Sequence, residues 1–297
     1  MSSQIPTFAP EQVWFTSDTH FGHENIIRFC NRPFKNAEEM NSELIRRWRE
    51  TVPEDGIVFH LGDFAHGSSR LWNDILCTLT GRKYLILGNH DMKSIRQGFM
   101  SRFELVTQQM TIRVGGQAIV LNHNPFLCYG GSYRDVWQLF GHVHSGPASN
   151  TGLDHPRLKM LFPLQYDVGV DNNSFRPVSF AEVKAKIEAQ VSEARIAAGI
   201  KDNGNGSIAR KIVFVDSGVA IDQKELTHLK EVATDIIELG SESPVKESIA
   251  RRISLLAGSV RYVYIGSRPL DDFRYVPIEV GKPITMNDVE KAIKILS

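Results

Sequence analysis

The chain contains a series of short apolar runs, each ending in Asp, Asn or His, and this series constrains its fold more than any other feature. Runs of about four to eight apolar residues bounded by glycine or polar residues are typical of buried strands. The polar residues at their ends are Asp18, His20, Asp63, Asn89, His90, Asp91, His123, His142 and His144. Five of the ten histidines occupy these positions. Because the ends of neighbouring strands meet at one edge of a sheet, we expect these side chains to form one site.

Two segments between the early runs have the features of helices. Residues 36–52 begin with asparagine, a good N-cap, and contain many helix formers, and residues 68–81 end in glycine. Residues 110–123 instead form two β-prone runs about a Gly-Gly pair, which predicts a hairpin. This order of strands and helices predicts an α/β fold, a four-layer αββα sandwich in which two mixed sheets are flanked by helices.

A change in composition divides the chain of 297 residues. Residues 198–211 are rich in Gly, Asn and Lys and have no apolar periodicity, which is typical of a linker. Strand-like and helix-like segments alternate again after it. We therefore predict a first domain over residues 1–198, a linker over 199–210 and a small α/β domain of unknown role over 211–297.

Composition and charge bear on the partners of the protein and on its cellular compartment. Lys+Arg and Asp+Glu are both 34, so the net charge is zero and does not favour nucleic acid as a partner, which stays an alternative. Three widely spaced cysteines do not make a disulfide framework, which favours a reducing compartment. Because no secretory signal and no long apolar run is present, we expect a cytoplasmic protein without a membrane partner. The sequence leaves the oligomeric state open.

The strand-end residues have the chemistry of metal ligands. Carboxylate, imidazole and amide groups occur together without thiolate, a set that suits Mn²⁺, Fe or Zn²⁺ better than a cysteine-rich structural zinc site. A capping or loop role would explain any one of these residues, but it does not explain why so many are placed alike. Two ligand sets with one shared carboxylate would hold two ions about 3.5–4 Å apart. Such a pair of ions can stabilise both the attacking and the leaving oxygen when a phosphoryl group is displaced.

The motifs D-x-H, G-D, G-N-H-D, H and G-H-x-H occur in this order and resemble the calcineurin-like metallophosphoesterase superfamily. The opening "WFTSDTHFGHENII" and the closing "DVGVDNNSFRPVSFAEV" look like one bacterial and phage branch of it, and the resemblance covers about residues 12–195. It implies two metal positions joined by a bridging carboxylate, Asp63. The implied ligands are Asp18, His20 and His144 for the first ion and Asn89, His123 and His142 for the second.

The resemblance also implies roles for the residues that follow Asn89. His90 matches a histidine that does not bind metal and would protonate the leaving group or stabilise the phosphate oxygens. Asp91 matches the acidic residue that orients this histidine. In an extended segment alternate side chains share a face, so His142 and His144 are expected to point the same way, one toward each ion.

The implied reaction is hydrolysis of a phosphodiester or phosphomonoester by metal-activated hydroxide, with two divalent ions as cofactors. Manganese is preferred for these ions, with iron, zinc or nickel as alternatives. The preferred interpretation is a phosphodiesterase that acts on a nucleotide or another small phosphodiester. The alternatives are a nuclease or phosphatase using the same site, or a non-catalytic metal- or nucleotide-binding protein whose C-terminal domain is the functional partner.

Several residues near the motifs keep two interpretations each. His23 is expected to cap or pack against the following helix, with a place in the pocket as the alternative. His60 is expected to be a hydrogen-bonded core residue, and His66 either lines the cleft or lies on the surface. Arg32 is either a phosphate clamp or a solvated surface arginine. In the C-terminal domain, Asp216 ends an apolar strand and marks either a ligand site or a capped turn.

Overall fold

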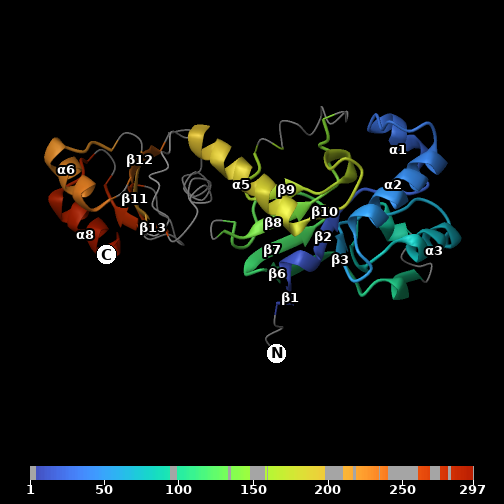
Figure 1. Ribbon diagram of the computed structural model, residues 1–297. Coiled ribbons are helices and arrows are strands. Elements are labelled where there is room, and N and C mark those ends of the chain that lie inside the picture. The colour runs from blue at the N-terminus through green and yellow to red at the C-terminus, as the bar shows by residue number, and fades with distance from the viewer. Residues whose placement is uncertain are drawn as a thin grey trace. The chain divides into compact units, whose positions relative to one another are not determined.

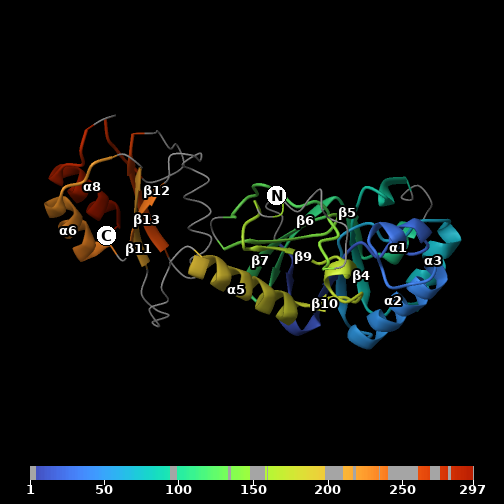
Figure 2. The same ribbon diagram turned by 90° about the horizontal axis from the view of Figure 1, so that it is seen from above.

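The chain divides into two compact units, Met1–Val191 and Ser192–Ser297. The structure, a computed structural model, describes residues 5–93, 99–132, 135–147, 158, 160–197, 210–216, 219–233, 235–239, 260–267, 275–279 and 282–296 (Figures 1 and 2). The predicted linker lies outside the described residues except for residue 210. The domain boundaries at 198 and 211 therefore stay a prediction.

The first sheet of unit 1 is mixed and has the strand order β10-β2-β3-β4-β5. All neighbours in it are parallel except β10, which is antiparallel to β2. The register pairs Thr16 with His60 and His60 with Leu85, so β2, β3 and β4 end at the same edge. The strands are β2 (Val13–Thr16), β3 (Ile57–His60), β4 (Arg82–Ile86), β5 (Leu105–Thr107) and β10 (Val178–Ser179).

The second sheet of unit 1 is also mixed, with the order β1-β6-β7-β8-β9. Its β6 and β7 form the predicted hairpin, closed by Gly115 and Gly116 at φ values of 54° and 89°. A two-residue hairpin turn whose twist matches that of the strands needs positive φ at both of its central residues. Glycine adopts positive φ easily, which explains the glycine pair. The strands are β1 (Thr7–Phe8), β6 (Gln109–Val114), β7 (Gln117–Asn122), β8 (Trp137–Phe140) and β9 (Gln165–Asp167).

Helices cover the first sheet on one side, where Figure 1 shows α1, α2 and α3 together. The side chain of Asn36 accepts a hydrogen bond from the Glu39 amide (2.8 Å), so Asn36 is the predicted N-cap. The α-helices are α1 (Glu24–Phe29), α2 (Ala37–Thr51), α3 (Ser69–Thr78) and α5 (Phe180–Ala197). The described 3₁₀ turns are η1 (Pro10–Gln12), η2 (Asp91–Lys93), η4 (Phe99–Arg102) and η6 (Val170–Asn172).

The main core of unit 1 lies between the two sheets. Phe15 and Phe59 of the first sheet, Ile119 and Leu139 of the second, and Val183 of α5 are fully buried in it. Packing the two inner faces together leaves the strand ends of both sheets at a common edge, where loops can carry polar side chains. The predicted fold class, an α/β sandwich of two mixed sheets flanked by helices, is confirmed.

Unit 2 contains a four-stranded parallel sheet in the order β12-β11-β13-β14. One of the helix-like segments of the sequence, residues 244–258, lies outside the described residues. Asp216, at the end of β11, is buried and accepts a hydrogen bond from the Ser267 hydroxyl (3.3 Å). The elements are β11 (Arg210–Asp216), α6 (Gln223–Val232), β12 (Asp235–Leu239), β13 (Val260–Gly266), β14 (Tyr275–Pro277) and α8 (Met286–Leu296).

Across the described part of both units, none of the helices has the length and apolar character that a bilayer crossing requires.

Candidate metal centre

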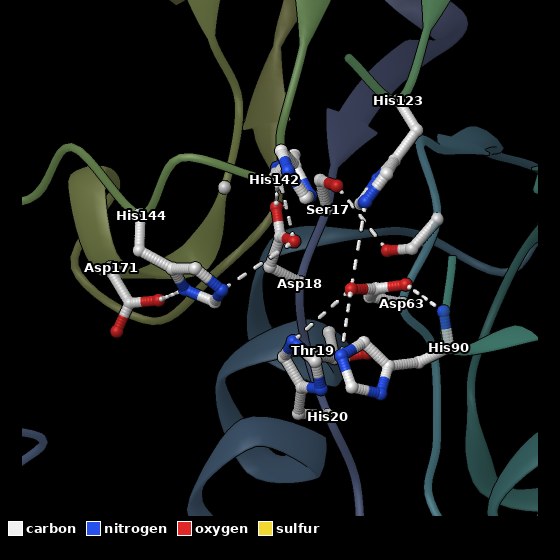
Figure 3. Close-up of polar contacts among 12 residues, drawn as sticks. Ser17, Asp18, Thr19, His20, Asp63, His90, His123, His142, His144 and Asp171 are labelled. Atoms are coloured by element: carbon white, nitrogen blue, oxygen red, sulfur yellow. Dashed lines mark hydrogen bonds and ion pairs between the residues drawn. The ribbon is translucent and has the colours of Figure 1, made fainter. Parts of the chain in front are cut away.

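Seven of the side chains singled out in the sequence meet at the common edge of the two sheets in unit 1 (Figure 3). Six of these seven side chains form two groups, in each of which the ligand atoms all lie within 4.8 Å of one another. Site A consists of Asp18, His20 and His144, and site B consists of Asp63, His123 and His142. Asn89 adjoins site B, because its Oδ1 lies 3.1 Å from Nε2 of His123. All seven predicted ligands are therefore neighbours in space, although residues 18 and 144 lie far apart in the chain.

Asp63 lies between the two sites. Its Oδ2 is 3.5 Å from Nε2 of His20 in site A and 3.5 Å from Nε2 of His123 in site B. Its Oδ1 accepts a hydrogen bond from the amide of His90 (2.9 Å). One carboxylate oxygen thus faces a histidine nitrogen of each site.

The backbone at the site adopts an uncommon conformation. The predicted ligands with φ between 47° and 71° are Asp18, His20, Asp63, His142 and His144. Each such non-glycine residue costs about 1–3 kcal/mol, a cost that persists where the surrounding structure imposes the geometry. Strand β8 ends at Phe140, so His142 and His144 are not in an extended segment. Their expected alternation along a strand is wrong, because the left-handed backbone of the loop sets their directions.

Glycines in the motifs allow the carboxylates to approach the backbone closely. A Cβ added to Gly88 would lie 2.2 Å from Oδ1 of Asp63. A Cβ added to Gly141 would lie 2.2 Å from Oδ2 of Asp18 and 2.1 Å from Oγ of Ser17. Only glycine therefore leaves room for Asp18 and Asp63 in their observed positions.

We expect Gly141→Ala to weaken metal binding at site A. Overpacking of this kind costs about 1–3 kcal/mol, which would be roughly a 10–100-fold loss in Mn²⁺ affinity as Asp18 is displaced. The measurement is a Mn²⁺ titration of chelator-stripped protein by calorimetry. Gly130→Ala is the matched control, because a Cβ there has nothing within 4 Å. An unchanged affinity in the Gly141 variant would contradict the packing argument.

Two histidines direct Nε2 toward Asp63. Nδ1 of His123 donates to the carbonyl of Leu61 (2.7 Å), which leaves its Nε2 facing Asp63. Nδ1 of His20 lies 3.4 Å from Nδ1 of His23, and Nε2 of His20 is buried without a hydrogen-bond partner among the described residues. Burial, and then the charge of His144, lowers the pKa of His20 well below its usual value. A buried imidazole nitrogen that makes no hydrogen bond and faces a carboxylate fits a metal ligand.

The carboxylates make both sites attractive to cations. Burial alone lowers the pKa of His144, but Asp18 and Asp171 outweigh it and raise that pKa to about 11. Burial also lowers the pKa of His123, yet Asp63 and Asp18 raise it to about 9. His144 and His123 thus favour positive charge because carboxylates face them, and a bound metal ion would take the place of their protons.

A family profile described as calcineurin-like phosphoesterase matches residues 12–170, more than half of the chain. The chain belongs to this family. This calcineurin-like phosphoesterase is therefore a metal-dependent hydrolase of phosphorylated substrates, as the order of its motifs predicts. The family binds divalent metals, and the residues of sites A and B fit that requirement.

Relatives of this phosphoesterase occur in archaea and phages. An uncharacterized protein of Methanocaldococcus jannaschii is 33% identical over 179 residues, which cover 60% of this chain and 92% of that protein. The gene 66 protein of Mycobacterium phage D29 is 40% identical over 185 residues, covering 54% of this chain and 87% of the phage protein.

Two solved structures are similar to the phosphoesterase. A protein of unknown function from Aquifex aeolicus has a TM-score of 0.44 and 25% identity, covering 60% of this chain and 99% of its own. The nuclease MPE of Pseudomonas putida has a TM-score of 0.33 and 18% identity, covering 45% of this chain and 62% of its own.

His90 of the phosphoesterase lies beside the centre. Its side chain is 42% exposed, and its Nε2 is 3.9 Å from Oδ2 of Asp63. Its ring centroid is 5.2 Å from that of His20, in an edge-on arrangement. Figure 3 shows the partly exposed imidazole of His90 beside Asp63 and His20.

Asp91 has a different role from the predicted one. Its Oδ2 accepts hydrogen bonds from the amides of Asp63 (2.8 Å) and Gly88 (2.9 Å), and its Oδ1 accepts from the amide of Phe64 (2.9 Å). Both carboxylate oxygens are thus used by backbone groups, and the expected orientation of the His90 ring by Asp91 is wrong. Asp91 instead joins the loop after β3 to the loop after β4, and burial raises its pKa to about 6.

The sequence did not identify Asp171 or the true position of Arg32. Asp171, in η6, lies 2.6 Å from Nδ1 of His144 and pairs with Arg32, whose side chain is buried. Both interpretations of Arg32, a phosphate clamp and a solvated arginine, are therefore wrong. Asp171 follows the apolar run "VGV", so the same signal that selected the other ligands was present for it.

The other histidines near the centre have distinct surroundings. His60 is buried and hydrogen-bonded as expected, with Nε2 2.9 Å from the hydroxyl of Thr19. His23 occupies the N-cap position of α1 without a side-chain cap, so the capping interpretation is wrong. The ring of His23 stacks on the ring of His66, which is exposed, with centroids 4.8 Å apart. The centroid of the His23 ring also lies 5.8 Å from that of the His90 ring. His23 and His66 therefore extend the centre on its outer side.

Proposed function

We propose that this phosphoesterase hydrolyses phosphodiesters with two divalent metal ions, and that its substrate is a nucleotide or another small phosphodiester. The observation that carries the proposal is the position of Asp63, 3.5 Å from a histidine nitrogen of each site. Asp18, His20 and His144 would hold one ion, and Asn89, His123 and His142 the other, with Asp63 shared. When bound, the two ions supply charge neutralisation for the phosphate and activation of water at neutral pH.

His90 supplies a proton donor, which the metal ligands do not. Because its ring is exposed and its amide is tied to Asp63, it can donate a proton to the departing oxygen of a substrate bound at the centre. The bound ions would supply a hydroxide nucleophile, and His90 would give a ring proton to the leaving oxygen, which would depart as an alcohol. This assignment of His90 is part of the proposal.

We further propose manganese as the working metal. Sites A and B contain carboxylates, imidazoles and the amide oxygen of Asn89, which are ligands of intermediate to hard character. The thiol of Cys30 belongs to neither site, but it forms a third group with Asp171 and His144, so it lies beside one ligand of site A. Iron, zinc and nickel are the alternatives that a metal series would compare.

The test is hydrolysis of bis-p-nitrophenyl phosphate beside p-nitrophenyl phosphate by chelator-stripped protein to which Mn²⁺ is added. Mn²⁺-dependent turnover of the diester well above the monoester would support the proposal. Faster turnover of the monoester would replace it by a phosphatase. Binding of two ions without turnover of either compound would contradict hydrolysis of simple diesters and turn attention to nucleic-acid ends.

A further inference from the structure

We propose that Arg32 is the positioning residue of site A and that it makes the two metal positions unequal, an inference that rests on the proposed two-metal function. Arg32 is only 4% exposed and lies in the segment between α1 and α2. Its Nε and Nη2 donate to the two carboxylate oxygens of Asp171, each at 2.8 Å. Such a two-point contact fixes both the distance and the plane of the carboxylate.

The carboxylate held by Arg32 orients one ligand of site A directly. Oδ2 of Asp171 lies 2.6 Å from Nδ1 of His144, on the side of the ring away from Asp18 (Figure 3). Nε2 of the same ring lies 3.8 Å from Oδ1 of Asp18. A carboxylate that accepts from the distal nitrogen of a histidine sets its tautomer and its direction toward a metal.

The same guanidinium holds the backbone that carries the other two ligands. Nη2 of Arg32 donates to the carbonyl of Asp18 (2.7 Å), and Nη1 donates to the carbonyl of Thr19 (3.1 Å). Asp18 and His20 have φ values of 58° and 48°, so this segment is held in an unfavourable conformation. Charge-assisted hydrogen bonds from a buried group can stabilise it. All three residues of site A therefore depend on Arg32.

Site B is held mainly by other groups, and one link joins it to site A, because the amide of His142 donates to the carboxylate oxygens of Asp18 (2.9 and 3.1 Å). His123 is oriented by the carbonyl of Leu61, and the ring of His142 is exposed. Within the described part of the chain, the side-chain hydrogen bonds of Arg32 reach Asp18, Thr19, Met40 and Asp171 but no residue of site B. Loss of Arg32 should therefore release the ion at site A and leave the ion at site B.

The experiment measures Mn²⁺ per chain in wild type, Arg32→Ala and Arg176→Lys after dialysis at limiting Mn²⁺. Wild type is expected to bind two ions and Arg32→Ala one, with affinity for the lost ion reduced about 10–100-fold, the usual effect of removing an outer partner of a ligand. Arg176 is the matched control, because it pairs with Glu182 on the same unit without contacting either site. Electron paramagnetic resonance should change from a coupled pair to an isolated ion.

Double variants identify the site that is lost. Adding His123→Ala to Arg32→Ala should remove the remaining ion, whereas adding His144→Ala, a change within site A, should leave it in place. Guanidinium added to Arg32→Ala should restore the second ion, which a general loss of packing would not allow. If Arg32→Ala does not fold, Asp171→Asn interrupts the same path while Arg32 stays, and it should also lower affinity at site A alone.

The outcomes separate the two proposals. A wild type that binds no pair of ions overturns the proposed function and this inference with it. Two ions bound with unchanged affinities by the Arg32 and Asp171 variants, in a wild type that also binds two, overturn the inference alone. Equal loss of both ions in a folded Arg32→Ala protein likewise overturns it, because Arg32 would then act on the whole centre.

Discussion

Asp63→Asn is expected to weaken both metal ions and to reduce turnover of bis-p-nitrophenyl phosphate by about 10³-fold or more. The reason is that one carboxylate oxygen faces His20 and His123 at 3.5 Å each, so a single substitution removes negative charge from both sites. Loss of several kcal/mol of electrostatic stabilisation by two ions corresponds to this factor. The measurements are metal content per chain after dialysis and the initial rate at saturating Mn²⁺.

The control for this variant is Asp74→Asn. Asp74 lies on α3, and its side chain is 68% exposed, so removal of its charge should change neither metal content nor rate. Two ions per chain with full activity in Asp63→Asn would show that Asp63 is not the bridge. Loss of one ion only would assign Asp63 to a single site.

His90→Ala is expected to keep both ions and to slow the hydrolysis of diesters with poor leaving groups by about 10²–10⁴-fold, the range typical of general acid catalysis. The ring is outside the two ligand groups and partly exposed, so its removal takes away a proton donor and leaves the ligands in place. Rates on a nitrophenyl diester should fall much less, because nitrophenolate needs little protonation.

His228→Ala is a matched control for the histidine change. It lies in unit 2 with the same side-chain exposure of 42%, and it pairs with Glu231 instead of a residue of the centre. Equal losses on alkyl and nitrophenyl diesters in His90→Ala would assign His90 to stabilisation of the phosphate oxygens. Unchanged rates on both compounds would remove His90 from the reaction.

Local patterns explain why much of the fold could be predicted. The Asn36 cap, the hairpin at Gly115-Gly116 and the apolar runs of β2, β3 and β4 depend on residues close together in the chain. Parallel strands in register then place their following loops at one edge, so the meeting of the strand-end residues follows from the pattern. The family assignment was predictable for the same reason, because its motifs are short and keep their order.

The details of the centre depended on contacts that a local pattern does not contain. Asp91 was expected to orient His90, but its oxygens are taken by amides from two different loops. The directions of His142 and His144 come from left-handed backbone and not from alternation along a strand. Each of these features arises only when loops from separate strands pack together.

The sequence by itself determined the ligand types, their order and the α/β sandwich, because apolar periodicity and residue chemistry are local properties. Only the tertiary structure decided that Arg32 is buried against Asp171, a residue 139 positions away, and that this pair supports His144. A charged side chain takes the partner that the folded chain brings within reach, since an unpaired buried charge is costly. The pairing of Arg32 with Asp171 results from the packing of loops that are distant in the chain. The spacing of residues in the sequence therefore does not predict it.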